Sequence, residues 1–134
     1  NVRVALEDMQ ADRIVHGVRV LDDPRVVALA RERRVPFEVC LTSNLQTGVA
    51  VSANDHPLLT MLLAGLNVTI NTDDPSISQI TLSDEYWLAC KRLGVPYPVL
   101  AERIFAASDA AFLNDMERAD LDERLQQGLS PIMA

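Results

Sequence analysis

The sequence has few of the features that mark membrane, secreted or nucleic-acid-binding proteins. Its hydrophobic runs stop at about six residues, as in 61–66, far short of the roughly twenty that span a bilayer. The N-terminus has no basic region followed by an apolar one. Twelve Lys and Arg against nineteen Asp and Glu give a net charge of -7, which repels phosphate backbones and anionic lipids. We therefore expect a soluble, cytoplasmic protein that binds neither nucleic acid nor membranes.

Several common catalytic motifs are also absent. The sequence has no G-x-S-x-G serine elbow, no G-x-x-x-x-G-K-[ST] phosphate loop, and no H-x-E with P-C-x-x-C of the small zinc enzymes that act on cytosine. The two cysteines, Cys40 and Cys90, lie in apolar stretches without the close spacing of a metal or redox pair, so we expect buried free thiols.

The length limits the fold. The chain has 134 residues, about half of the roughly 250 that a complete eight-fold α/β barrel needs, and its 49% hydrophobic content is enough for a core. No repeat, low-complexity stretch or linker divides residues 1–134, which predicts one domain unit. Because the first residue is Asn1 rather than Met, we expect a piece of a longer protein.

Short β-branched or apolar runs alternate with helical patterns. We predict strands over 13–17, 37–41 and 67–71, and a polar loop over 42–54. Helices are expected around 2–9, 24–34, 56–64, 82–93 and 98–107, and again from 108 onward. Their predicted end signals are Asp23 with Pro24, Asp55, Gly65, and Thr81 with Asp84. This alternation predicts βαβ units and a parallel sheet.

Polar residues follow each predicted strand. The first strand ends in His16, the second in 42–44 and the third in Asp73 and Asp74. The carboxyl ends of parallel strands meet at one edge, where such folds place their chemistry. The two vicinal carboxylates repel each other unless a cation or donor lies opposite, so one could bind a metal while the other faces a ligand. A solvated, helix-capping turn is the alternative for the acids, and a satisfied core residue is the alternative for the histidine.

Three other polar residues are assigned structural roles. His56 lies among helix-start signals, and Arg13 and Glu38 near strand starts suit an ion pair. One strand-end histidine and one aspartate cannot supply the three or four protein ligands that zinc needs.

Five segments in order resemble the adenosine deaminase family. They are 13–17 (RIVHG), 38–48 (EVCLTSNLQTG), 56–58 (HPL), 71–75 (NTDDP) and 84–86 (DEY). The resemblance runs from residue 1 to about 113 and implies the C-terminal part of a metal-dependent TIM (β/α)8 barrel: about three βα units with parallel strands, followed by C-terminal helices. Val15 and Leu41 stand where the family usually has Gly and Pro.

The resemblance implies hydrolysis of adenosine to inosine and ammonia by a Zn²⁺-activated water. It implies that His16 orients the attacking hydroxide, that Asp73 ligates zinc, and that Asp74 hydrogen-bonds to a purine ring nitrogen. The family's His-x-His and His-Ala-Gly-Glu motifs have no counterpart here, so the remaining zinc ligands and the proton-shuttling glutamate are expected in a preceding part. We therefore expect the full-length protein to be the enzyme and this segment alone to be inactive.

Two alternatives remain. The full-length protein could act on another aminopurine compound, such as aminodeoxyfutalosine, adenine or N6-substituted AMP, because these variants share the zinc site. Alternatively, the segment could be a non-catalytic half-barrel interaction module. Three strands of an unclosed barrel leave two unpaired edges and a partly bare apolar inner face, which favours a homodimer or pairing with the missing N-terminal half.

Overall fold

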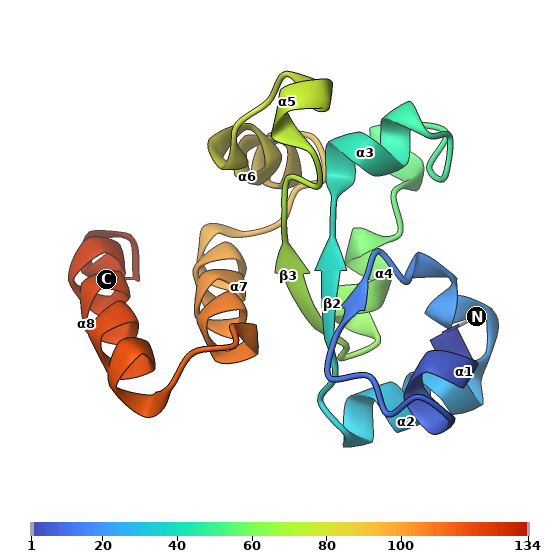
Figure 1. Cartoon of the computed structure of the whole chain (residues 1–134). Coiled ribbons are helices and arrows are strands. Elements are labelled where there is room, and N and C mark those ends of the chain that lie inside the picture. Colours follow the sequence, from blue (N-terminus) through green and yellow to red (C-terminus); the bar gives the residue numbers. More distant parts are fainter. Residues whose placement is uncertain (1, 134) are drawn as a thin grey trace.

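The computed structural model describes residues 2–133, which form a three-stranded sheet surrounded by helices (Figure 1). In chain order the elements are α1 (Val2–Glu7), β1 (Ile14–Val15), the 3-10 helix η1 (Val18–Asp22), α2 (Pro24–Glu32), β2 (Pro36–Val39), α3 (Leu41–Gln46), the 3-10 helix η2 (Ala53–Asp55), α4 (Leu58–Leu63), β3 (Asn67–Ile70), α5 (Pro75–Ser78), α6 (Leu82–Lys91), α7 (Tyr97–Ala110) and α8 (Asp115–Met133). Among these, no helix is both long enough and apolar enough to cross a membrane.

The sheet has the order β1-β2-β3, and both pairings are parallel. Ile14 lies opposite Phe37, which lies opposite Val68. The backbone ladder continues past the strand ends, because the His16 N–H donates to the Glu38 carbonyl at 2.8 Å and the Asn71 N–H donates to the Val39 carbonyl at 3.0 Å. The prediction of an α/β fold with three parallel strands is confirmed.

The two faces of the sheet differ. Ile14, Phe37 and Val68 share one face and pack into a hydrophobic core with residues of α1, α2, α4, α6 and α7. The opposite face carries Val15, Glu38 and Thr69, so it is mixed rather than apolar as expected. Arg13 Nε lies 3.1 Å from Glu38 Oε1; both residues were expected in ion pairs, and the structure pairs them with each other.

Local end signals account for several helices. Asp23 accepts a hydrogen bond from the Arg25 N–H at 2.9 Å, with Pro24 in the first helical position of α2. Thr81 and Asp84 form the predicted capping box of α6, and Gly65 has the left-handed backbone expected after α4, with φ of 72°.

Three sequence predictions are wrong. Asp55 does not cap α4; its carboxylate instead accepts from the Ser52 hydroxyl at 2.6 Å. Residues 42–54 are not a plain loop, since they contain most of α3 and the first two residues of η2. The C-terminal helix is interrupted after Ala110, because Asn114 caps a new helix by accepting from the Glu117 N–H at 3.0 Å. The two cysteines are free as expected, although Cys90 is only partly buried.

Gly17, the second residue after β1, allows a close approach between backbone and core. Its φ is 63°, and a Cβ atom at this position would lie 2.6 Å from Ile14 Cγ2 and 2.8 Å from Phe37 Cδ1. Gly48 has a similar φ of 74° with no atom near the corresponding Cβ position. A substitution at Gly48 therefore adds only backbone strain, whereas the same substitution at Gly17 adds strain and a steric clash.

We expect Gly17→Ala to lower the free energy of unfolding of the full-length protein by about 2–5 kcal/mol, combining left-handed strain with overpacking. Gly48→Ala, the matched control, should cost only the strain, about 1–2 kcal/mol. Urea unfolding monitored by circular dichroism measures both values. Equal losses for the two variants would contradict the close contact at Gly17.

Candidate active site

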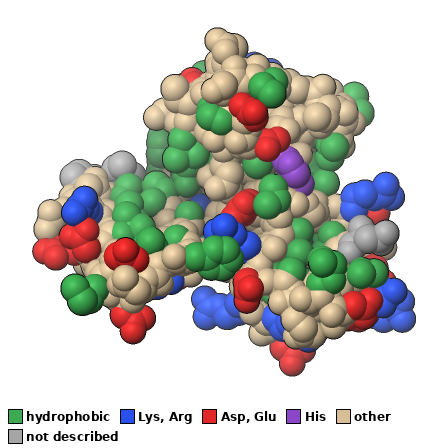
Figure 2. All heavy atoms as spheres, in the orientation of Figure 1, with side chains coloured by type: hydrophobic (Ala, Val, Ile, Leu, Met, Phe, Trp, Pro, Cys, Tyr) green, Lys and Arg blue, Asp and Glu red, His purple; other side chains and the backbone are tan. Residues whose placement is uncertain are grey.

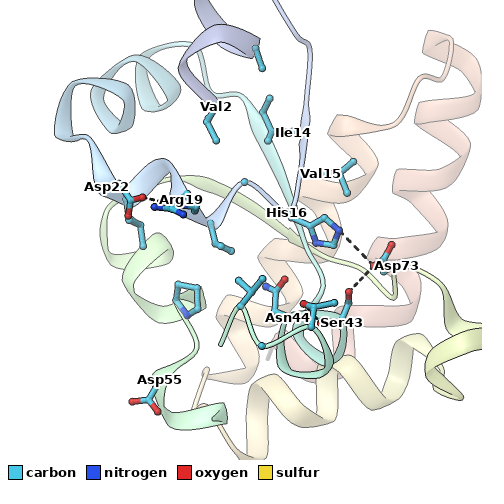
Figure 3. Close-up of a pocket in the computed structure, with 18 residues that line it drawn as sticks. Val2, Ile14, Val15, His16, Arg19, Asp22, Ser43, Asn44, Asp55 and Asp73 are labelled. Carbon is cyan, nitrogen blue, oxygen red and sulfur yellow. Dashed lines mark hydrogen bonds and ion pairs between the residues drawn. The ribbon is translucent and has the colours of Figure 1, made fainter. Parts of the chain in front are cut away.

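An open cleft of about 1100 Å³ lies at the carboxyl ends of the strands. His16 follows β1, Ser43 and Asn44 belong to α3, which follows β2, and Asp73 follows β3; all four line the cleft (Figure 3). In Figure 2 a histidine side chain lies beside acidic side chains in the hollowed centre of the visible face. The prediction that residues after the three strands share one edge is confirmed.

Asp73 is the centre of the polar contacts in the cleft. Ser43 Oγ donates to Asp73 Oδ2 at 2.7 Å, and His16 Nε2 lies 3.6 Å from the same oxygen (Figure 3). The second distance is too long for a direct hydrogen bond, so the imidazole and carboxylate interact electrostatically. Both side chains are about two-fifths exposed, at 40% for His16 and 39% for Asp73. The pair is therefore accessible to a ligand in the cleft.

Both residues have unusual backbone conformations. The φ angles of His16 and Asp73 are 60° and 61°, in the left-handed region that residues other than glycine seldom occupy. Such strain persists only where surrounding contacts enforce it, and it is concentrated at functional sites. His16 Nδ1 is buried and has no hydrogen-bond partner within the described residues, which leaves Nε2 as the ring nitrogen facing Asp73.

Asp74 lies outside this cluster. Its Oδ1 accepts from the Ile77 N–H at 3.1 Å and so caps α5, and its side chain does not line the cleft. Of the two roles considered for the Asp-Asp-Pro turn, Asp74 has the helix-capping role, whereas Asp73 lies in the cleft. No contact in the structure tests a purine-binding role for Asp74.

The sequence pattern indicates no role for Glu85, and it places Ser43 only among the polar residues 42–44 that follow the second predicted strand. Glu85 has no exposed surface, and its carboxylate accepts from the backbone N–H groups of Leu41 and Thr42 at the start of α3. Its position within the DEY segment at the start of α6 was the available signal. The contact itself spans more than forty residues and has no local sequence signature.

His56 has the structural role that was predicted. It is buried; its Nδ1 accepts from the Leu58 N–H at 3.1 Å, and its Nε2 lies 3.0 Å from the Asn44 side-chain amide. The atom of Asn44 that faces His56 Nε2 is the amide nitrogen Nδ2. Burial lowers the pKa of His56 to about 4. The ring is therefore neutral at pH 7 and holds α3 against the start of α4.

Cys40 lies just before α3 but cannot serve as a nucleophile. Burial, followed by the nearby carboxylates of Asp73 and Glu85, raises the pKa of its thiol to about 12. The thiolate, which is the reactive form, is therefore negligible at neutral pH.

The chain by itself does not contain a complete metal centre. Within residues 2–133, no three His, Cys, Asp or Glu side chains are grouped closely enough to hold a metal ion. Asp73 contributes one carboxylate next to one imidazole.

Comparison with known proteins identifies the family. Residues 1–128 match the adenosine deaminase family model, so the chain belongs to that family. Adenosine deaminase of Aliivibrio fischeri is 37% identical over 119 residues, covering 89% of this chain and 36% of that protein. Aminodeoxyfutalosine deaminase of Streptomyces coelicolor is 37% identical over 121 residues, covering 90% of this chain and 31% of that protein.

Solved structures show the same relationship. Adenine deaminase from Arthrobacter aurescens superimposes with a TM-score of 0.90 at 30% identity, over 96% of this chain and 39% of that one. An amidohydrolase from Burkholderia ambifaria, solved with bound zinc, gives a TM-score of 0.87 at 25% identity, over 96% of this chain and 36% of that one. The chain thus spans roughly a third to two-fifths of the length of these relatives.

The depressed pKa of His56 predicts pH-dependent stability. The unfolded ring takes up a proton below its ordinary pKa of 6.5, whereas the folded ring does so only near 4. The stabilisation by neutral His56 is therefore present above pH 6.5 and is lost as the pH falls toward 4, on the order of 2 kcal/mol by pH 5.

Urea unfolding of the full-length protein at pH 7.5 and pH 5 measures this loss. His56→Asn, which retains an acceptor for the Leu58 N–H but does not titrate, should lose less stability between the two pH values than the wild type. The same pH dependence in both proteins would show that His56 titrates normally.

Proposed function

We propose that the full-length protein containing this chain hydrolyses the exocyclic amine of adenosine, yielding inosine and ammonia. The observation that carries the proposal is the placement of His16 Nε2 3.6 Å from Asp73 Oδ2 at the carboxyl edge of a parallel sheet, in a chain of the adenosine deaminase family. An imidazole and a carboxylate that line the same cleft are groups that can activate a water molecule. The net reaction forms a C6–O bond, breaks the C6–N bond and consumes one water.

We also propose that residues 1–134 form the C-terminal part of a TIM (β/α)8 barrel domain. In the described chain, the outer edges of β1 and β3 have no neighbouring strand. Buried backbone donors and acceptors require partners, and closure of a barrel provides them. The half-covered face with Val15, Glu38 and Thr69 would become the barrel interior. The chain matches only 36% and 39% of the length of two relatives, as a part of a longer barrel domain would, and this supports the assignment.

Exposed apolar side chains also support a missing partner. A hollow of about 550 Å³ near β3, α6 and α7 has apolar lining, including Trp87 and Tyr97, which are 58% and 54% exposed. Hydrophobic side chains gather over the left-hand part of the molecule in Figure 2, where α7 and α8 lie. Such patches are typical of surfaces covered by another part of the protein. We assign this surface to the N-terminal part of the barrel rather than to a homodimer partner.

The residues present fit one edge of a zinc site. Asp73 Oδ2 is engaged by Ser43, while Oδ1 makes no hydrogen bond within the described residues and belongs to a side chain that lines the cleft. A carboxylate oxygen is a suitable zinc ligand, and a relative has been solved with zinc. We therefore assign Asp73 as one ligand and place the others in the preceding part of the barrel. When bound, zinc supplies Lewis-acid chemistry that makes water nucleophilic near neutral pH.

The chain's own residues would orient the reaction. With its proton on Nε2, the His16 ring can donate a hydrogen bond to the attacking oxygen beside Asp73 and stabilise its negative charge. Ser43 donates to Asp73 Oδ2 and so restricts rotation of that carboxylate. We also propose that Asp74 contacts a purine ring nitrogen through Oδ2, since Oδ1 already caps α5; this contact would lie beside the cleft that the described residues line, next to Asp73.

Other aminopurines are a second candidate substrate class. The aminodeoxyfutalosine deaminase and the adenosine deaminase are equally identical to this chain, at 37%. Adenosine, adenine, aminodeoxyfutalosine and N6-methyl-AMP differ in what is attached to the purine, not in the carbon that is attacked. A panel of these four compounds, tested with the full-length protein, distinguishes them: adenosine, adenine and aminodeoxyfutalosine release ammonia, whereas N6-methyl-AMP releases methylamine.

Asp73→Asn in the full-length protein should reduce both bound zinc and deamination by at least about 10²-fold, because an amide oxygen is a weaker, uncharged ligand. Zinc is measured by metal analysis and activity by loss of the adenosine absorbance. Asp22→Asn is the matched control, since Asp22 lines the same cleft but pairs with Arg19 on the surface. Wild-type zinc content and turnover in Asp73→Asn would exclude the proposed role.

A further inference from the structure

The carboxylate of Glu85 lies behind the candidate active site and has no exposed surface. Its Oε2 accepts from the Leu41 N–H at 2.6 Å, its Oε1 accepts from the Thr42 N–H at 3.0 Å, and the Thr42 hydroxyl also donates to Oε1. No ion pair to Glu85 occurs within the described chain. The hydrogen bonds from one short segment therefore offset the cost of burying this carboxylate.

That segment is the first turn of α3. Leu41 and Thr42 occupy its first two positions, whose N–H groups have no partner inside the helix. Cys40 at the cap position provides no side-chain hydrogen bond, so Glu85, on α6, takes the place of a local cap. A carboxylate is also favoured there by the helix dipole.

The next residue of this turn, Ser43, contacts the active site. Ser43 Oγ donates to Asp73 Oδ2 at 2.7 Å, so one peptide unit separates the Thr42–Glu85 contact from the Ser43–Asp73 contact. The residue after Ser43 is fixed as well, because the Asn44 amide contacts buried His56 at 3.0 Å. Helix α3 is thus held on two sides, and its serine presents a hydrogen bond to the carboxylate that faces His16.

We propose that Glu85 is a positioning residue of the deamination site: by fixing the first turn of α3, it holds Ser43 where its hydroxyl orients the Asp73 carboxylate. This inference rests on the function proposed above. A well-packed apolar residue at position 85 could stabilise the core as well as a buried charge does. A carboxylate is needed to satisfy two backbone donors and a hydroxyl at once, and thereby to set the register of α3 against the strand ends.

The test uses the full-length, zinc-loaded protein with Glu85→Gln, Ser43→Ala and the double variant. The amide of Glu85→Gln keeps the shape but turns one acceptor into a donor facing N–H groups. Mutation of a residue that hydrogen-bonds to a metal ligand typically lowers metal affinity or activity by 10–100-fold. We expect Glu85→Gln to weaken zinc retention in chelator competition by about 10-fold or more and to lower kcat similarly, with KM for adenosine within about two-fold.

The double variant separates positioning from general stability. Because Glu85 acts through Ser43, Glu85→Gln combined with Ser43→Ala should retain zinc no worse than about two-fold below Ser43→Ala alone. Asp84→Asn is the matched control: it removes a carboxylate from the adjacent, exposed position of α6, weakens the Thr81 capping box, and should leave zinc retention unchanged. Thermal unfolding reports any loss of stability in each variant.

The outcomes are distinguishable. Independent, multiplicative effects of Glu85→Gln and Ser43→Ala, or wild-type zinc retention in folded Glu85→Gln, overturn the inference while leaving the proposed function intact. A wild-type protein that neither retains zinc nor deaminates any aminopurine overturns the proposed function and this inference together. If Glu85→Gln does not fold, Thr42→Val, which removes only the hydroxyl donor, replaces it; at least three-fold weaker zinc retention supports the inference, and unchanged retention overturns it.

Discussion

Parallel pairing of the three strands is the constraint on which the rest of the structure depends. The backbone hydrogen bonds that continue past the ends of β1 and β3, from His16 to Glu38 and from Asn71 to Val39, bring residues far apart in the sequence to the same edge. Without this alignment, the imidazole of His16 and the carboxylate of Asp73 would not lie close together. The contacts of Asp73 with His16 and with Ser43 follow from it.

Around this edge the molecule combines strain with rigid support. His16 and Asp73 both have left-handed backbones within three residues of the ends of their strands. Next to His16, Gly17 packs closely against Phe37. Asp73 is held by α3 through the hydrogen bond from Ser43. Helix α3 is in turn fixed by two buried polar contacts, with Glu85 at its start and His56 beside Asn44. The core packing thereby limits the freedom of the groups that face the cleft, which is the preorganisation that catalysis requires.

Much of this fold could be predicted because its signals are local. The runs around Ile14, Phe37 and Val68 are short and β-branched or apolar, and the Thr81 box marks the start of α6 by itself. Helix α3 could not be predicted, because its cap comes from Glu85, 44 residues away from Leu41. Asp55 has the residue type of a cap but is engaged by Ser52 instead. In the site, His16 and Asp73 were identifiable as strand-end residues, whereas the contribution of Ser43 depends on side-chain orientation that no spacing reveals.

We propose that Asp73 and His16 form one side of a zinc-dependent site that the rest of the barrel completes. X-ray diffraction from crystals of the full-length protein, with anomalous scattering collected at the zinc edge, locates the metal. Our proposal predicts a zinc peak about 2.0–2.2 Å from a carboxylate oxygen of Asp73, with His16 Nε2 facing the same coordination sphere. A zinc ion bound away from Asp73, or an Asp73 carboxylate and His16 ring on opposite sides of the closed barrel, would contradict it.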